Sequence, residues 1–479
     1  MKKTLVVAVL LGIMIPQVSF SQEVPSDDAP TVLTLEEAVR IALSENVAVK
    51  VADKEIERSQ YARKGSYAAL FPQVDGSASY SRTIKKQVMY MDFDMSALGG
   101  GGMGGDTADP AETATRAADA KAKGTTPGGG IEVGRWNTYS AGITAGMPLV
   151  NAQLWKSLKI SGQDVELAVE KARSSRLETV TQVKQAFYGV LLAKEAFNVY
   201  KEVYENALAS FEQTEKKYKA EKASELEYQR AKSTVQNAIP NVYDSENSIY
   251  LGLWQLKAVM GIDLDENIDV AGSLSDFSSQ MLMGVAVDDE VSLADNSSLR
   301  QLAIQAEELA NTIKLQQYAS LPSLNLQFSY SLNAMTNDFK FSEYNWSPYS
   351  AVGLSLAVPI FAGGKRLNAV RQARVQYDEL NMQRDNAERQ LRIAIRQYLS
   401  QMETCMKNYA SAQIGVETAR KAYEIAVKSY NLGSSTITEL NSAQLALTQA
   451  QLAESQAIYN FVVARASLEQ TLGSDFTEE

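Results

Sequence analysis

The segment SLPSLNLQFSYSL, residues 320–332, alternates hydrophobic and polar side chains along most of its length. From Leu324 to Leu332 every second residue is leucine, phenylalanine or tyrosine, and the residues between them are asparagine, glutamine or serine. Because successive side chains of a strand point to opposite sides, this pattern predicts a strand with one hydrophobic and one polar face. Most of the surrounding sequence is typical of long helices, so the role of this strand decides the fold class.

The chain of 479 residues contains two tandem copies of one pattern. Four pairs of segments match, at offsets of 250, 211, 212 and 212 residues: 67–82 with 318–331, 139–150 with 349–361, 218–231 with 430–443, and 256–261 with 468–473. The unequal first offset indicates 39 extra residues in the first copy, between Lys85 and Arg135. We therefore divide the chain into a leader (1–21), a first repeat (22–262) with an insertion (85–135), a connecting equatorial segment (263–297) and a second repeat (298–479).

The first residues have the organisation of a secretory signal. Lys2 and Lys3 precede a hydrophobic run from Leu5 to Ile15, and a small-x-small site ends at Ser21. This order predicts a signal peptide that is removed after Ser21, with an uncleaved anchor as the alternative. No cysteine lies near this site, so we expect no lipid anchor. No later stretch approaches the roughly 18 consecutive apolar residues of a membrane helix, so a membrane crossing would have to use strands.

Composition argues against several function classes. The formal net charge is −11, and it becomes −13 when Lys2 and Lys3 leave with the leader, which disfavours nucleic acid or anionic lipid as a partner. There is no histidine and one cysteine, Cys405, which we expect to be buried. These counts remove histidine-based catalysis and thiolate or histidine metal sites, so we expect no enzyme, no cofactor and no metal.

The insertion contains a G-x-G-x-x-G sequence at Gly99, Gly101 and Gly104. A dinucleotide-binding fingerprint needs a strand before it and a helix after it, whereas this one lies in a glycine-rich stretch. A flexible loop is therefore favoured over a nucleotide site.

Four strands are predicted, at 73–82, 136–149, 323–332 and 346–360, each near the ~9–11 residues of a membrane-crossing strand. Aromatic residues near the strand ends predict an interfacial girdle: Trp136, Tyr139, Trp346 and Tyr349. One such strand could equally belong to a soluble sheet packed on helices, but four in an exported chain favour a membrane. Bacterial single-chain barrels need at least ~8 strands, so we expect several chains to combine their strands in one barrel.

Two uninterrupted helices are predicted at 152–219 and 365–431, each roughly 100 Å long at ~1.5 Å per residue. Heptad-like stripes rich in alanine predict coiled-coil packing, although a structural rod would carry them too. Prolines are expected at the junctions of strands with helices: Pro72, Pro148, Pro322 and Pro359. After each long helix, Ser224-x-x-Glu227 and Thr436-x-x-Glu439 predict capping boxes, as does Thr34-x-x-Glu37 near the start of the chain.

Taken together, LTLEEAVRIALSEN (33–46), the four junction prolines, VPIFAGG (358–364) and YNLGSSTITELNSAQLAL (430–447) resemble the TolC-like outer-membrane efflux protein family. The resemblance covers nearly all of the predicted mature chain. It implies a mostly helical fold with a membrane β-barrel part, in which three chains share 12 strands above a tapering helical tunnel through the periplasm. It also implies partners: an adaptor (membrane fusion) protein, an inner-membrane pump of the RND or ABC type, and outer-membrane lipid.

The resemblance further implies roles for the helical hairpin turns. They are expected to face the adaptor and to form a periplasmic gate in which Glu439, Glu227 and Tyr430 take part, with Tyr430 and Glu227 in contact. The adaptor-facing residues are expected to be Gly433, Ser434, Ser435, Thr436, Lys222, Ala223 and Ser224. This chain departs from the family pattern where Ser435 replaces an arginine latch and where Glu221 replaces a turn glycine.

The leading hypothesis is thus an outer-membrane exit duct for small molecules such as drugs. A type I protein-secretion duct is the alternative within transport. An exported coiled-coil structural or adhesion protein is the alternative from another class, and an exported enzyme is third because no catalytic constellation is present.

Overall fold

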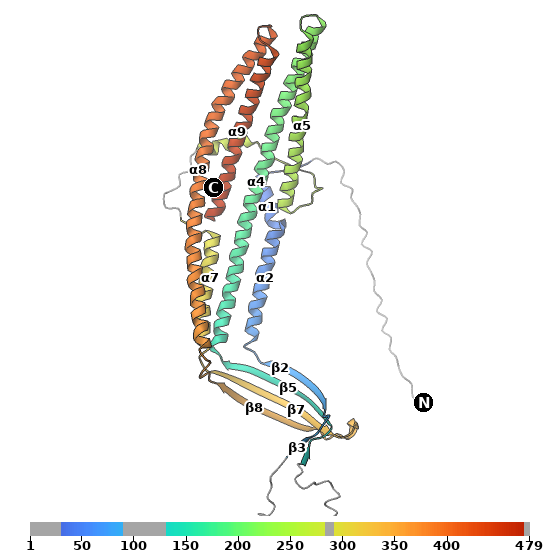
Figure 1. Cartoon of the computed structure of the whole chain (residues 1–479), viewed down its shortest axis with the longest axis vertical. Coiled ribbons are helices and arrows are strands. Elements are labelled where there is room, and N and C mark those ends of the chain that lie inside the picture. The colour runs from blue at the N-terminus through green and yellow to red at the C-terminus, as the bar shows by residue number, and fades with distance from the viewer. Residues whose placement is uncertain (1–29, 90–130, 283–291, 474–479) are drawn as a thin grey trace, which may run out of the picture. The chain divides into compact units, whose positions relative to one another are not determined.

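The computed structural model describes residues 30–89, 131–282 and 292–473, and it is mostly helical (Figure 1). The expected order of helix, two strands, long helix, turn and helix occurs twice. The first copy comprises α2 (Val47–Ala68), β2 (Gln73–Arg82), β5 (Asn137–Val150), α4 (Ala152–Lys219) and α5 (Glu225–Met260). The second comprises α7 (Ser297–Tyr318), β7 (Ser323–Thr336), β8 (Ser347–Ala357), α8 (Lys365–Asn431) and α9 (Ile437–Leu472). The predicted bounds of both long helices are confirmed.

The remaining elements are short: β1 (Thr31–Leu33), α1 (Leu35–Glu45), β3 (Gln87–Met89), β4 (Ile131–Val133), β6 (Ile268–Val270), α6 (Ser278–Leu282) and the 3₁₀ helices η2 (Leu274–Phe277) and η3 (Phe341–Glu343). The predicted capping box at the start of α1 is confirmed, because the Glu37 carboxylate accepts from Thr34 N at 3.0 Å and the Thr34 hydroxyl accepts from Glu37 N at 3.3 Å. The predicted leader lies outside the described residues.

The chain divides into two compact units, and each unit contains segments of both repeats. The first unit consists of Met1–Val51, Ser175–Asp295 and Leu391–Glu479. The second consists of Ala52–Ser174 and Asn296–Gln390.

The first unit has a core formed where α4, α5 and α9 meet the segment after α5. Phe187, Leu256 and Phe461 are at most 2% exposed. β1 pairs in parallel with β6, which fixes the connecting segment against the start of the chain. A buried ion pair crosses this core, with Lys184 Nζ 2.8 Å from the Glu469 carboxylate. In the same unit Cys405 is buried, as expected from the sequence.

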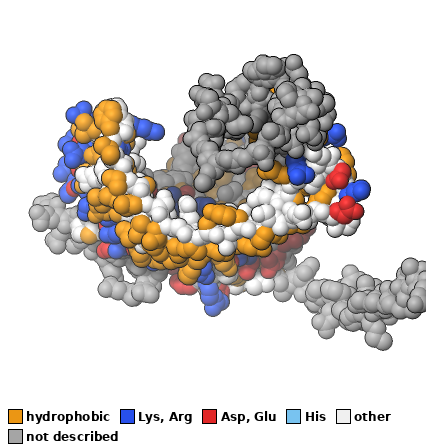
Figure 2. All heavy atoms as spheres, turned by 90° about the horizontal axis from the view of Figure 1, so that it is seen from below, with side chains coloured by type: hydrophobic (Ala, Val, Ile, Leu, Met, Phe, Trp, Pro, Cys, Tyr) orange, Lys and Arg blue, Asp and Glu red, His pale blue; other side chains and the backbone are white. Residues whose placement is uncertain are grey.

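The second unit contains a four-stranded antiparallel sheet in the order β2-β5-β7-β8 (Figure 1). Its register places apolar residues in rows across one face, for example Val74, Ala145, Phe328 and Val352 in one row and Met147, Leu326 and Leu354 in another. The opposite face carries small and polar rows, for example Ser79, Ser140, Asn333 and Ser347. Figure 2 views this end of the molecule and shows hydrophobic side chains along the outer side of a curved arc, with polar side chains and backbone along the inner side. The alternation predicted for each strand is confirmed.

The structure describes the two ends of the insertion. β3 pairs with β4 in antiparallel register, from Gln87 with Val133 to Met89 with Ile131. The glycine-rich stretch with Gly99, Gly101 and Gly104 lies outside the described residues. Among the helices that the structure describes, none is long and apolar enough to cross a membrane.

Candidate functional site

The turns that join α4 to α5 and α8 to α9 have the same backbone path, 212 residues apart. Gly433 has φ +76° and Glu221, at the equivalent position, has φ +58°. Ser434 N donates to Ser429 O at 2.9 Å, and Lys222 N donates to Lys217 O at 2.7 Å. Both long helices therefore end in the same left-handed turn. Within the described chain Glu221 is the one non-glycine residue with positive φ, so the departure noted in the sequence puts a strained residue at this turn.

The next helices begin with the two predicted capping boxes, and both are confirmed. The Glu227 carboxylate accepts from Ser224 N at 3.1 Å, and the Ser224 hydroxyl accepts from Glu227 N at 3.2 Å. The Glu439 carboxylate accepts from Thr436 N at 3.0 Å, and Glu439 N donates to Thr436 Oγ1 at 3.3 Å. Each glutamate thus satisfies a backbone N–H that the helix start leaves unpaired.

Ser435 adds a contact that the sequence did not predict. Its hydroxyl donates to the Glu439 carboxylate. This hydrogen bond, followed by that from the Thr436 backbone, lowers the pKa of Glu439 below its ordinary value. The carboxylate therefore stays ionised at neutral pH while it remains exposed at the turn.

The expected contact between Tyr430 and Glu227 is replaced by another in the described structure. The Tyr430 hydroxyl lies 2.7 Å from Thr214 Oγ1, and both side chains are buried. Thr214 Oγ1 also donates to the Ser210 carbonyl at 2.8 Å, so Tyr430 is the donor in the bond between the two hydroxyls. The hairpins of the two repeats are therefore joined by a tyrosine–threonine bond, while Glu227 caps its own helix.

Lys217 strengthens the same contact from α4. Its Nζ lies 3.3 Å from the Tyr430 carbonyl oxygen and 4.7 Å from the centre of the Tyr430 ring. A cation over an aromatic face is attracted by the ring quadrupole. Lys217 thus contacts both the backbone and the ring of Tyr430, immediately before the turn at Gly433.

Around Tyr430 the two hairpins bury a small apolar cluster, which we call the tip cluster. Its buried members are Ala231, Tyr430, Ile437 and Leu440, and Phe211, Tyr423, Ala426 and Val427 pack against them. The cluster combines residues of α4, α5, α8 and α9, so it couples the ends of both hairpins. α5 contributes the small side chain of Ala231, and the larger apolar side chains come from α4, α8 and α9.

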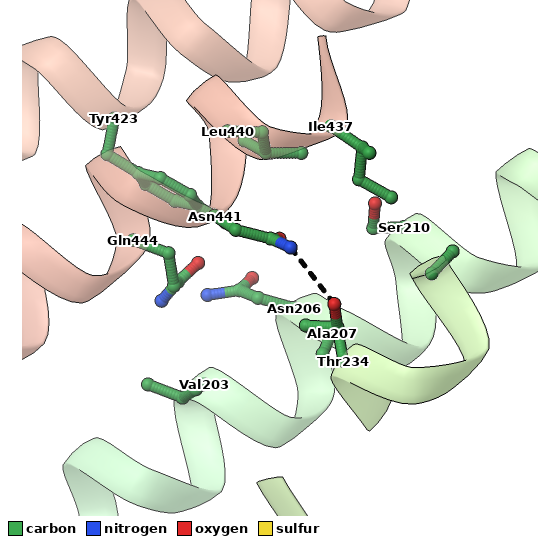
Figure 3. A pocket seen from close by; sticks show the side chains of 11 residues that line it. Val203, Asn206, Ala207, Ser210, Thr234, Tyr423, Ile437, Leu440, Asn441 and Gln444 are labelled. Carbon is green, nitrogen blue, oxygen red and sulfur yellow. Dashed lines mark hydrogen bonds between the residues drawn. The ribbon is translucent and has the colours of Figure 1, made fainter. Parts of the chain in front are cut away.

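A cavity of about 30 Å³ adjoins the tip cluster (Figure 3). Figure 3 shows Asn206, Asn441 and Gln444 directed into the space between the hairpins, and Asn441 Nδ2 donates to Thr234 Oγ1 at 3.0 Å. The hydroxyl of Ser210, which also lines the cavity, is buried without a hydrogen-bond partner. A space of this size and polarity suits one or two water molecules, and it is too small for a transported molecule.

The turns themselves are open to solvent. The adaptor-facing residues expected from the sequence are exposed or half-buried: Lys222, Ala223, Ser224, Gly433, Ser434, Ser435 and Thr436. Two apolar residues beside the turns were not predicted from the sequence. They are Leu226, which is 59% exposed, and Leu432, which is 84% exposed. An exposed leucine beside each turn gives this surface an apolar contact as well as charge.

The four junction prolines lie between the helices and the sheet, with one difference from expectation. Pro72 and Pro322 follow helices and precede β2 and β7, and Pro359 follows β8. Pro148 instead lies inside β5, where it pairs with Asn325 and the register shifts before Val150. Proline lacks an N–H for the ladder, so a bulge at this position is the expected consequence.

The predicted aromatic girdle is partly reorganised by the register. Tyr139 lies on the apolar face and stacks on Tyr80, with ring centroids 4.9 Å apart, and Tyr344 lies 5.4 Å from Tyr139. Tyr349 pairs with Ser331 and therefore lies on the polar face, opposite to Tyr139, and the girdle itself stays a prediction. Trp136 and Trp346 directly precede β5 and β8. Tyr80 and Tyr344 are aromatic residues of this end that the sequence prediction left out.

No group of three or more His, Cys, Asp or Glu side chains in the described ranges is arranged to hold a metal ion. The turns thus combine two helix caps, one buried hydroxyl pair and an exposed carboxylate.

Comparison with known proteins relates this geometry to a family. The profile described as "Outer membrane efflux protein" matches residues 38–262 and 290–474. The outer membrane protein TolC of Vibrio cholerae is 22% identical over 295 residues, which are 60% of this chain and 66% of TolC. The alkaline protease secretion protein AprF of Pseudomonas aeruginosa is 22% identical over 288 residues, 60% of this chain and 59% of AprF. The chain thus spans less than two thirds of each of these relatives.

The fold is similar to that of a solved channel. The Campylobacter jejuni CmeC outer membrane channel superposes with a TM-score of 0.68 at 18% identity, covering 93% of this chain and 87% of that one. Because the family profile matches far more than half of the chain, this protein belongs to the outer membrane efflux protein family, and it is an outer-membrane protein rather than an enzyme.

Proposed function

We propose that the protein is the outer-membrane exit duct of a tripartite efflux pump, formed by three copies that share one barrel. The observation that carries the proposal is the sheet of the second unit, which has one apolar face, one polar face and two free edges. β2 and β8 are the outer strands: β2 pairs with β5 and β8 with β7, and on its other side neither pairs with any described strand. Within lipid an unpaired edge is too costly to persist, so these edges need partners.

The directions of the strands fit pairing between copies. Each neighbouring pair in the sheet is antiparallel, so β2 and β8 run in opposite directions. The β2 edge of one copy can therefore pair in antiparallel fashion with the β8 edge of the next. Three copies of a four-stranded sheet give 12 strands, above the minimum of about eight for a closed barrel.

The direction of the chain supports a topology for this duct. Both strand pairs join the helices at one end of the sheet, and the insertion and the β7–β8 loop lie at the other. With the helices forming a tunnel in the periplasm, the insertion 85–135 is extracellular.

The division into two repeats, 22–262 and 298–479, joined by the equatorial segment 263–297, remains our proposal for the domain organisation.

We place the periplasmic gate and the adaptor contact at the hairpin turns. The exposed, ionised Glu439 supplies negative charge three times around one axis in a trimer, which focuses a cation-attracting potential. Tyr430, bonded to Thr214, holds the two hairpins of each chain together, and Glu227 fixes the start of α5. Exposed Leu226, with the polar turn residues, offers an adaptor both apolar contact and hydrogen bonds.

One relative points to a protein cargo, because AprF is named for alkaline protease secretion. A type I protein-secretion duct is therefore the alternative within transport, with an ABC pump in place of an RND pump. An exported structural or adhesion protein is disfavoured by membership of an efflux family.

A deletion strain of the source bacterium tests the proposal. Cells lacking the gene should accumulate a fluorescent dye that is an efflux substrate, and the wild-type gene should restore dye export. Leu326→Arg, on the apolar face, should fail to restore export, and Gln327→Arg, on the polar face, is the matched control that should succeed. Normal dye export in the deletion strain with loss of one secreted protein from the medium would instead establish the secretion duct.

A further inference from the structure

The apolar face of the sheet ends in aromatic and basic side chains at the loop end, opposite the helices. Arg82, the last residue of β2, has the same strand parity as Val74 and Tyr80, so it lies on the apolar face. Its guanidinium lies 5.7 Å from the centre of the Phe339 ring, which belongs to the β7–β8 loop. Lys86 Nζ lies 4.8 Å from the centre of the Trp136 ring. Each aromatic ring is thus covered by a cation.

The residues around these contacts, 82–89 and 131–136, form what we call the loop base. The loop base contains four cations, Arg82, Lys85, Lys86 and Arg135, and one carboxylate, Glu132. In the described parts of the chain no ion pair includes any of these four cations, whereas Lys340 of the adjacent loop lies 3.8 Å from Glu343. Figure 2 shows Lys and Arg side chains at the right-hand end of the arc, together with Asp and Glu side chains.

This local charge contrasts with the chain as a whole, whose net charge is −11. Net charge alone disfavours an anionic lipid, but binding depends on the charges within a Debye length, about 8 Å at physiological salt. Four cations without carboxylate partners, two of which (Arg82 and Lys86) lie over exposed aromatic rings, are suited to phosphate groups at a membrane surface. Trp136 is 38% exposed and Phe339 is 56% exposed, so both rings are available to the interface.

We propose that the loop base binds the phosphate groups of a phosphorylated glycolipid in the outer leaflet. The inference rests on the proposed topology, in which this end of the sheet faces outward. Arg82 projects from the lipid-facing side and can offer its planar fork to a phosphate, while Lys86 contributes a point charge above Trp136. At the same end of the sheet the rings of Tyr80, Tyr139 and Tyr344 pack against one another, which adds aromatic side chains to this surface.

The test uses the full-length trimer in neutral detergent and counts bound lipid by native mass spectrometry. The probes are bisphosphorylated lipid A, the same lipid without its phosphates, and phosphatidylglycerol. Wild-type protein should bind bisphosphorylated lipid A at least tenfold more tightly than either of the other two. Equal affinity for the dephosphorylated lipid would overturn the proposal, and equal affinity for phosphatidylglycerol would overturn the choice of a glycolipid.

Substitutions then locate the site. Arg82→Gln with Lys86→Gln should reduce the tenfold preference to twofold or less. Lys201→Gln with Lys232→Gln removes the same two charges from exposed positions on α4 and α5 and should leave the preference unchanged. Retention of the preference in the first variant would overturn the assignment to the loop base. Trimer mass and single-channel conductance, measured on the same samples, show separately whether the proposed duct itself has formed.

Discussion

Removal of either hydroxyl from the Tyr430–Thr214 pair should destabilise the hairpin tip, and the two removals should lower its free energy of local opening by different amounts. In Tyr430→Phe the remaining Thr214 hydroxyl still donates to the Ser210 carbonyl at 2.8 Å, so no donor is left unpaired. The loss is that of one ordinary hydrogen bond, about 1 kcal/mol. In Thr214→Val the buried Tyr430 hydroxyl loses its acceptor, and an unsatisfied buried donor costs about 2 kcal/mol.

The double variant distinguishes this explanation from a simple loss of packing. With both hydroxyls gone no unsatisfied donor remains, so Thr214→Val with Tyr430→Phe should be less destabilised than Thr214→Val alone. The Lys217 contact with the tyrosine ring survives in every variant, because phenylalanine keeps the ring.

Hydrogen exchange of the backbone amides of residues 432–440 in the assembled protein measures the free energy of local opening. Tyr430→Phe should raise exchange about fivefold and Thr214→Val about thirtyfold, at about 1.4 kcal/mol for each factor of ten. Amides of α7 serve as the control and should not change. Equal effects of the two single variants, or additivity in the double variant, would refute the assigned donor and acceptor.

Three further predictions follow from the same geometry. Leu326→Arg should cost roughly 2–4 kcal/mol per copy near mid-membrane and abolish trimers in gel electrophoresis, whereas Gln327→Arg should assemble, and equal damage would reject the assigned faces. Glu439→Gln, which keeps the helix cap, should assemble but lose cation preference in planar-bilayer recordings. In wild type the lowered pKa of Glu439 should keep that preference at pH 5, and the preference should be lost only as the pH falls below the ordinary carboxyl value. An unchanged preference in the variant would mean that Glu439 acts only as a helix cap. Glu221→Gly should slow amide exchange at its turn by relieving about 1 kcal/mol of strain, and Gly433→Ala should speed exchange at the other turn by adding a similar strain. Faster exchange in Glu221→Gly, or slower exchange in Gly433→Ala, would contradict a left-handed backbone at that turn.

The long helices and the strands could be predicted because their signals are local. The bounds of α4 and α8 were predicted from uninterrupted helical sequence that ends at Gly433 in one copy and before Ser224 in the other. The strands were predicted from the alternation of apolar and polar residues, and in β7 this alternation matches the two faces of the sheet from Leu324 to Leu332. The repeat offset of 212 residues also predicts that Glu221 adopts the conformation of Gly433, as it does.

The partners of side chains between helices could not be predicted in the same way. Whether Tyr430 meets Glu227 or Thr214 depends on which faces of α4 and α8 meet, and no spacing in the sequence determines that pairing. Leu432 is exposed because the turn ends the apolar stripe of α8 before it can be covered. The face of Tyr349, in contrast, follows from the sequence, because Tyr349 is an odd number of residues from Val352 and the two side chains therefore point to opposite faces of the strand.

Engineered disulfides can show whether the two free edges of the sheet pair between copies. Within one chain β2 and β8 are separated by β5 and β7, three strand spacings or about 14 Å, whereas a disulfide needs Cα atoms within roughly 7 Å. Any disulfide between cysteines placed along β2 and β8 must therefore join two copies.

Single cysteines are introduced at successive positions of each edge strand in a Cys405→Ser background, and pairs are oxidised in native outer membranes. Pairs in register should give covalent species up to a trimer and no larger. Species that remain monomeric at every register, or a ladder that continues beyond three copies, would contradict a closed barrel shared by three copies.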